Sequence, residues 1–270
     1  MPGVHAGRAL DGLLDLVFPK RCVGCREPGA WLCTACAAAL QPLPDDRCRR
    51  CGAPLRRAGR PARSGPGVRR LPACRECAGR DLAFSAASAA FCYEGPARAL
   101  VTACKFRALR SLTGDLAERA APAFAAAAAR AGAGAVVTSV PAHRDHQSDR
   151  GFDLAESLAR RLARDSGLAY APLLRRVRHG ARQSGLDRAS RAANVHDAFA
   201  LREGGLRVGT RIKRVIIVDD VYTTGETLNQ CAEALAHAVL DPHVFTFART
   251  VRATPAPASR DHALPKERCR

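Results

Sequence analysis

Aromatic side chains are scarce in this sequence. They make up 5% of its 270 residues, with nine Phe, three Tyr and one Trp. Proteins that hold single-stranded nucleic acid commonly stack bases on such rings, so the scarcity argues against a dedicated single-strand reader. Acidic residues are also few, because 25 Asp and Glu stand against 43 Lys and Arg, a formal charge of +18. That balance favours an anionic partner such as nucleic acid or a phosphorylated substrate, although a GC-rich genome also enriches arginine.

Long apolar runs are lacking as well. No run approaches the roughly 20 residues that a membrane span needs. The early apolar group between Leu10 and Val17 is interrupted by Asp11 and Asp15, which does not fit a secretory signal. We therefore expect a cytoplasmic protein with no membrane insertion, in which thiols stay reduced. In that setting the twelve cysteines are better interpreted as metal ligands than as disulfides.

Eight of the cysteines form four C-x-x-C pairs within one short stretch. Each pair has the spacing of a turn that presents two thiolates to one tetrahedral zinc ion. The pairs are Cys22 and Cys25, Cys33 and Cys36, Cys48 and Cys51, and Cys74 and Cys77. Eight ligands suffice for two structural zinc sites. Sequential pairing (the first two pairs, then the last two) and a cross-braced arrangement are both compatible with the spacing.

Between the last two pairs lies a basic, Pro- and Gly-rich loop, from Leu55 to Ala73. It carries six arginines and no acid, a composition typical of disorder. The stretch from Lys20 to Arg80 holds 14 basic and 4 acidic residues, and it stays basic after two zinc sites of four thiolates each are counted. Contact with nucleic acid and a solvated loop without a partner are both consistent with this charge.

The stretch from Val215 to Thr227 carries the clearest functional signal. It begins with four consecutive apolar residues, Val215 to Val218, which suit a strand buried on both faces of a parallel sheet. Asp219 and Asp220 follow at the carboxyl end of that strand, where an open α/β sheet leaves a crevice for ligands. Threonines and a glycine then lead into a helical pattern, so backbone N–H groups can meet a phosphate at the helix N-terminus. A polar turn with a helix cap is the simpler alternative, but a cap does not need two adjacent carboxylates. We predict a sugar-phosphate site, with vicinal hydroxyls on the Asp pair.

The rest of the chain predicts further α/β elements. We expect strands at 85–93, 135–140 and 243–250, helices at 97–109, 116–131 and 150–165, and a basic lid at 175–199 with a helix at 186–195. The loop after the second strand is a second candidate anion site. The predicted organisation is a short helix in residues 1–19, a double zinc ribbon in 20–80, an α/β domain in 81–252 and a disordered tail in 253–270.

The 215–227 stretch resembles the thirteen-residue signature of type I phosphoribosyltransferases, which bind 5-phosphoribosyl 1-diphosphate (PRPP). Together with other motifs, it makes the chain similar to the ComF family, competence-associated proteins that pair a zinc ribbon with a phosphoribosyltransferase-like fold. The other motifs that carry the likeness are the C-x-x-C pairs, Tyr93-Glu94-Gly95-Pro96, Lys105, Val140-Pro141, Arg150-Gly151-Phe152, Gln183-Ser184-Gly185-Leu186, Arg191, Asn194 and Ala198-Phe199. The likeness extends from about Leu10 to Val251. Asp153 departs from it, because asparagine is expected after Gly-Phe.

The resemblance implies an α/β fold with a mostly parallel sheet, helices on both faces and a preceding double zinc ribbon. It implies PRPP binding with Mg2+, and a role in natural transformation, the uptake and internalisation of DNA. The implied PRPP-binding residues are Asp219, Asp220, Val221, Tyr222, Thr223, Thr224, Gly225 and Thr227. The implied pyrophosphate loop and lid contain Val140, Pro141, Arg150, Gly151, Lys105 and Gln183.

Two classes of function remain open at this point. One is an enzyme of the pentosyl-transferring type, in which departing pyrophosphate is stabilised electrostatically. No residue identifies the acceptor or a catalytic group. The other is a non-catalytic protein that senses PRPP, or that binds single-stranded DNA or the uptake machinery through its basic zinc module.

Overall fold

The structure is a computed structural model that describes residues 20–55, 74–106, 111–142, 152–177, 198–204, 212–236 and 238–251. The predicted N-terminal helix, most of the basic loop, the helix at 186–195 and the C-terminal tail lie outside these residues. So do Arg150, Gly151 and Gln183. Across the described ranges, no helix combines the length and apolar character required to cross a membrane.

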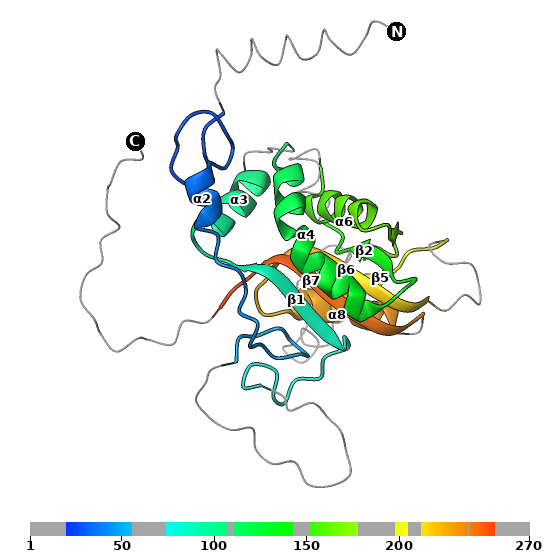
Figure 1. Ribbon diagram of the computed structural model, residues 1–270. Helices are drawn as coiled ribbons and strands as arrows, with labels where there is room; N and C mark the ends of the chain where they lie inside the picture. Colours follow the sequence, from blue (N-terminus) through cyan, green and yellow to red (C-terminus); the bar gives the residue numbers. More distant parts are fainter. Residues whose placement is uncertain are drawn as a thin grey trace, which may run out of the picture.

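A parallel sheet of five strands forms the centre of the described chain (Figure 1). Its strand order is β1-β7-β6-β2-β3, and every neighbouring pair is parallel. The strands are β1 (Ala86–Cys92), β2 (Val136–Ser139), β3 (Ala169–Tyr170), β6 (Ile212–Tyr222) and β7 (Val239–Arg249). Helices connect them as a parallel sheet requires. These are α3 (Gly95–Phe106), α4 (Leu112–Ala131), α6 (Leu154–Asp165) and α8 (Glu226–Leu235). The predicted α/β fold with a mostly parallel sheet is confirmed.

The central strand β6 is buried on both faces. Ile216 and Val218 pack in one apolar cluster with helices α3, α4 and α6, whereas Val215 and Ile217 pack in a second cluster with α8. The strand is longer than the sequence predicts, because its pairing with β7 continues as far as Tyr222 opposite Arg249. The two carboxylates therefore lie within the strand, two residues before its end, and not at the start of a loop.

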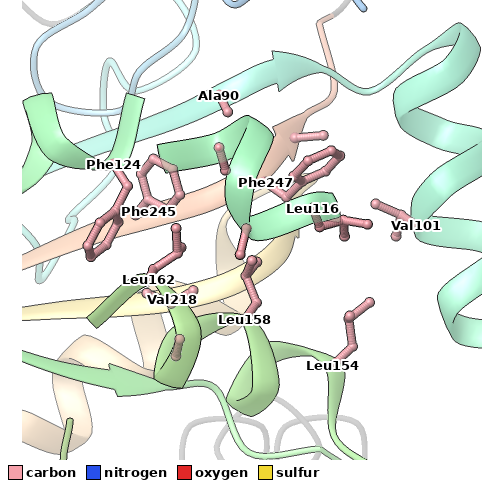
Figure 2. Packing of buried hydrophobic residues seen from close by; sticks show 14 of the residues in the cluster. Ala90, Val101, Leu116, Phe124, Leu154, Leu158, Leu162, Val218, Phe245 and Phe247 are labelled. Carbon is pink, nitrogen blue, oxygen red and sulfur yellow. The ribbon is translucent and has the colours of Figure 1, made fainter. Parts of the chain in front are cut away.

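Helix α4 packs across the sheet through its largest side chain (Figure 2). Phe124 meets Phe245 of β7 edge to face, with ring centroids 5.0 Å apart. The helix begins at Leu112, four residues before the predicted start. Leu112 and Leu116 are both fully buried, so packing holds the first turn in place. Helix α6, by contrast, begins only at Leu154, since Asp153 caps it.

The cysteine-rich module lies against the same sheet. It contains the short helix α2 (Thr34–Ala38), and the segment that joins its two halves runs antiparallel along β1. Leu43 N donates to Ala90 O at 3.0 Å, and Cys92 N donates to Gln41 O at 2.8 Å. This pairing covers the outer edge of β1, which would otherwise expose unpaired backbone groups.

Two short strands stand apart from the main sheet. β4 (Leu174–Arg176) and β5 (Phe199–Leu201) pair antiparallel. They are the two ends of the predicted basic lid, whose middle lies outside the described residues. The lid was predicted from charge alone, so its paired ends were not expected.

Candidate functional site

A cavity of about 440 Å³ opens at the carboxyl ends of β2 and β6. This is the edge of a parallel α/β sheet at which ligands bind. The described residues that line it come from six parts of the chain. They are Cys104, Lys105, Val140, Pro141, Ala142, Phe152, Asp153, Leu154, Ala155, Arg176, Asp219, Asp220, Val221, Thr223 and Thr227.

The two adjacent carboxylates, Asp219 and Asp220, both line this cavity. Lys105 Nζ, from the end of α3, lies 2.8 and 2.7 Å from the two carboxylate oxygens of Asp220. Asp219 Oδ1 accepts a hydrogen bond from the Asp220 backbone N–H at 2.8 Å. Burial and the neighbouring charge of Asp220 raise the pKa of Asp219 to about 8. Lys105 pairs with Asp220, so among the described residues Asp219 has no ion-pair partner of its own.

The loop between β6 and α8 has the shape that its glycine permits. Gly225 caps α8 in the left-handed conformation, with φ of 80°, and a Cβ at this position would overlap the Tyr222 ring. Thr223 and Thr227 line the cavity. Thr224 and Gly225 do not line it, although the Thr224 hydroxyl accepts a hydrogen bond from the Glu226 N–H at 3.4 Å. The N-terminus of α8 thus faces the same space as the carboxylates.

Glu226, the first residue of α8, is bulky for a position beside a phosphate, but its side chain is directed away from the cavity. Its carboxylate lies 3.9 Å from the Arg80 guanidinium and accepts a hydrogen bond from Gln230 Nε2 at 3.3 Å. These contacts hold the negative charge outside the cavity, where it does not oppose an anion in the loop.

Tyr222 is placed differently from its neighbours in the signature. Val221 lines the cavity, but the Tyr222 side chain is buried on the other side of the strand. Its ring lies under the guanidinium of Arg249, 3.9 Å from the ring centroid. Tyr222 therefore does not line the cavity, and its ring instead packs beneath the loop, next to Gly225.

The opposite wall is formed by the end of β2 and the start of α6. Val140 and Pro141, two residues of the predicted pyrophosphate loop, line it. Asp153 Oδ1 accepts from Glu156 N at 3.0 Å, and Asp153 Oδ2 accepts from Ala142 N at 2.9 Å. One carboxylate thus caps the helix and also ties down the loop after β2. Burial raises the pKa of Asp153. An asparagine, with a single acceptor oxygen, could make only one of these two bonds.

Arg176 is a cavity residue that the sequence did not single out. It projects from β4, stacks on Phe199 of β5 at 4.9 Å from the ring centroid, and lines the cavity. The only sequence signal was its place in the basic run that begins at Arg175. Its spatial partner is 23 residues away in sequence, across the part of the lid that lies outside the described residues.

The eight cysteines form two groups of four. Cys22, Cys25, Cys33 and Cys36 make the first zinc centre, and Cys48, Cys51, Cys74 and Cys77 make the second. The sulfur atoms within each group lie within 4.8 Å of one another. Sequential pairing is thereby confirmed, and the cross-braced alternative is wrong.

The second zinc centre has the dimensions of a metal site. Its Sγ–Sγ distances include 3.4 Å for Cys51 to Cys74, 3.7 Å for Cys74 to Cys77 and 3.8 Å for Cys48 to Cys77. A tetrahedron with Zn–S bonds of about 2.3 Å has edges of roughly 3.8 Å. A hydrogen bond from the Cys51 thiol, together with backbone N–H groups, lowers the pKa of Cys48 to about 4. The donor set fits structural zinc.

Comparisons with known proteins agree with both halves of the chain. Residues 13–78 match the family described as Double zinc ribbon domain. The DNA utilization protein YhgH of Salmonella typhi is 29% identical over 227 residues, which cover 82% of this chain and 92% of that protein. Competence protein F of Haemophilus influenzae is 34% identical over 100 residues, or 37% of this chain. The chain is similar to these two proteins, in keeping with the resemblance to the ComF family.

The match to the Haemophilus ComF relative spans only 43% of that protein's length. Among solved structures, the chain is similar to a glutamine phosphoribosylpyrophosphate (PRPP) amidotransferase from B. subtilis complexed with ADP and GMP. That similarity has 27% identity and a TM-score of 0.29, over 41% of this chain and 21% of the other. It is therefore a local likeness.

Proposed function

We propose that this protein is a member of the ComF family, that it binds PRPP with Mg2+ in the cavity at the ends of β2 and β6, and that it acts in the cytoplasm during natural transformation. One observation carries the proposal. Asp219 and Asp220, near the carboxyl end of the central strand, line one cavity of about 440 Å³ together with Thr223 of the following loop and Thr227 of helix α8. Vicinal hydroxyls suit the carboxylates, and a phosphate suits the loop and the helix N-terminus.

The charges of the cavity are the reason for including Mg2+. Among the residues that the structure describes, three carboxylates line it (Asp153, Asp219 and Asp220), against two basic side chains (Lys105 and Arg176). The described part of the site is therefore not positive by itself toward a polyanion such as PRPP. Mg2+ favours oxygen ligands from carboxylates and phosphates, so it can join the two. When bound, the ion supplies charge neutralisation between the diphosphate and the Asp pair.

The remaining contacts assign the parts of the ligand. The ribose hydroxyls lie on Asp219 and Asp220 in our proposal, and the 5-phosphate lies in the loop of Thr223 to Thr227. The diphosphate extends toward the end of β2, within reach of Lys105. Arg176 stands at the lid side, where an acceptor or the diphosphate would enter.

A role in DNA handling is the second part of the proposal. It rests on two names, since the Haemophilus relative is called a competence protein and the Salmonella relative a DNA utilization protein. The charge of +18 is compatible with phosphate contacts to a single strand. Such binding loses affinity steeply as the salt concentration rises.

The first test is calorimetric titration of PRPP with Mg2+ into the zinc-loaded protein. We expect saturable binding by the wild type and its loss in the double variant Asp219→Asn/Asp220→Asn. Asp45→Asn is the matched control, since Asp45 is a fully exposed carboxylate of the zinc module. Absence of binding by folded, zinc-loaded wild type would overturn the PRPP proposal. Binding that the double variant keeps would place the ligand elsewhere.

Two further assays separate the classes of function. Release of pyrophosphate from PRPP with a nucleobase or amine acceptor identifies a phosphoribosyltransferase, and binding without release identifies a PRPP-responsive protein. Fluorescence anisotropy with a labelled single strand, repeated over a salt series, tests the DNA role. DNA binding that survives the double Asp variant would assign it to the basic module rather than to the cavity.

A further inference from the structure

The last residue of β7, Arg249, joins the sheet to the second zinc centre. Its guanidinium is buried, with a side chain only 3% exposed. Nη1 donates to the carbonyl oxygen of Cys51 at 2.8 Å, and Nη2 donates to Glu76 Oε2 at 2.6 Å. Cys51 is a ligand residue of one knuckle, and Glu76 lies between the two ligands of the other. A single side chain therefore contacts both halves of the second zinc centre.

The same guanidinium contacts the base of the β6–α8 loop. It lies over the Tyr222 ring, and the ring fills the space beside Gly225 that a Cβ would need. The next residue, Thr250, donates its N–H to the Tyr222 carbonyl at 2.9 Å and its hydroxyl to the Thr223 carbonyl at 3.2 Å. Residues 249 and 250 thus fix the start of the loop from behind.

A second connection reaches the end of the loop. Arg80, three residues after Cys77, donates to the Thr224 carbonyl at 2.7 Å. The following segment is attached to α8, because Asn229 Oδ1 accepts from Ala83 N at 2.7 Å and Asn229 Nδ2 donates to Asp81 O at 3.3 Å. The loop therefore presents Thr223 and Thr227 to the cavity while its other side contacts residues that follow the second zinc centre.

We propose that the second zinc centre positions the β6–α8 loop through Arg249, Glu76 and Arg80, so that zinc binding there and anion binding in the loop strengthen each other. Zinc fixes the turn that carries Glu76 to the turn that carries Cys51. Without the metal, Arg249 loses the geometry that pairs its buried charge, and the Tyr222 ring loses its cover. Arg249, Glu76 and Arg80 are positioning residues, since none of them lines the cavity.

The first zinc centre provides an internal contrast. Cys22 packs in the cluster of α3, α4 and α6, on the face of the sheet opposite to α8. None of the contacts described for the first four cysteines reaches residues 222–229. Only the second centre should be linked to the loop.

The effect on ligand affinity rests on the proposed function, but the effect on the loop does not. We would measure hydrogen–deuterium exchange of the peptide covering residues 222–229 in the zinc-loaded wild type, Glu76→Gln and Arg80→Gln. Both variants keep all eight cysteines. We expect exchange of this peptide to rise about fivefold or more, a typical size for coupling between sites, with exchange at residues 22–36 unchanged. Glu27→Gln, at an exposed carboxylate of the first ribbon, is the matched control and should leave the loop unaffected.

The reciprocal measurement uses the rate at which zinc leaves the protein to a colorimetric chelator. Because coupling is mutual, PRPP with Mg2+ should slow the release of one of the two zinc ions by about fivefold or more, and Glu76→Gln should abolish this protection. Unchanged loop exchange in both variants would overturn the proposal, as would equal protection of both zinc ions. If the wild type does not bind PRPP, the proposed function fails, while the exchange experiment still decides whether the second zinc centre positions the loop.

Discussion

Lys105 forms an ion pair with both carboxylate oxygens of Asp220, with its Nζ 2.7 Å from Oδ2 and 2.8 Å from Oδ1. Both residues line the cavity at the carboxyl end of the central strand. The lysine belongs to α3 and the aspartate to β6, 115 residues apart. In the absence of ligand, the ammonium group holds a carboxylate that the proposed site uses. A bare divalent cation must compete with Lys105, whereas PRPP gains from its charge.

Replacing this lysine should therefore move two affinities in opposite directions. We expect Lys105→Gln to weaken PRPP binding and to strengthen binding of Mn2+ alone, followed by electron paramagnetic resonance. Loss of one nearby charge is worth about 1 kcal/mol, or roughly fivefold in Kd, for each ligand. Lys213→Gln, at an exposed lysine of β6, should change neither affinity. A shift of both affinities in the same direction would contradict this account of the ion pair.

Because the pKa of Asp219 is raised, replacing this carboxyl group should stabilise the protein by an amount that depends on pH. A carboxyl group with a pKa near 8 in the folded state and near 4 when unfolded binds more protons when folded, so it destabilises the protein increasingly as pH rises between these values. We expect Asp219→Asn to raise Tm relative to wild type, by a margin that widens from pH 6 to pH 8 and is constant above. Asp45→Asn should show no such trend. A margin that shrinks with rising pH would reverse the assigned sign.

The zinc centres should differ in their effect on stability. We expect two zinc ions per wild-type chain by mass spectrometry of metals, one in Cys51→Ser and one in Cys25→Ser. Cys51 is buried in the cluster beneath α8, while Cys25 is exposed, so loss of the second centre should lower Tm further. Cys92→Ser is the control that should retain both ions, because Cys92 belongs to neither group of four. Equal effects of Cys51→Ser and Cys25→Ser on Tm would argue against the tighter packing of the second centre.

Asp153 should stabilise the start of α6 and the loop after β2 more than the asparagine that the family resemblance leads one to expect. Asp153→Ala removes a helix cap and should lower the free energy of unfolding by about 1 kcal/mol in chemical denaturation. Asp153→Asn should recover the cap but lose the hydrogen bond from Ala142, which raises hydrogen exchange at residues 140–142. If Asn matches the wild type in both measurements, the second oxygen has no structural role here.

The sequence by itself determined the features that depend on short-range order. Val215 to Val218 is a run without polar residues, so the strand had to be buried on both faces, and the structure confirms this through two separate clusters. The C-x-x-C spacing fixed the knuckles, because four residues are enough to form such a turn. Lys105, Val140 and Pro141, which the family resemblance assigns to the pyrophosphate loop and lid, line one cavity, while their role there stays a prediction.

The tertiary structure alone decided what long-range packing controls. Strict alternation along β6 would place Tyr222 on the face of Ile216 and Val218, yet its ring packs in the cluster of Val215 and Ile217. The orientation follows from Arg249, whose guanidinium covers that ring, and no local pattern predicts a contact between residues 27 positions apart.

The same reason applies to Arg176, to the two bonds of Asp153 and to the choice between zinc pairings. In each case the deciding partner lies beyond the local turn, so its approach is set by how the sheet and helices pack. The sequence specified the chemical groups of the site, because these follow from residue type and spacing. Only the folded chain specified which of them share one cavity, because that depends on contacts between distant strands.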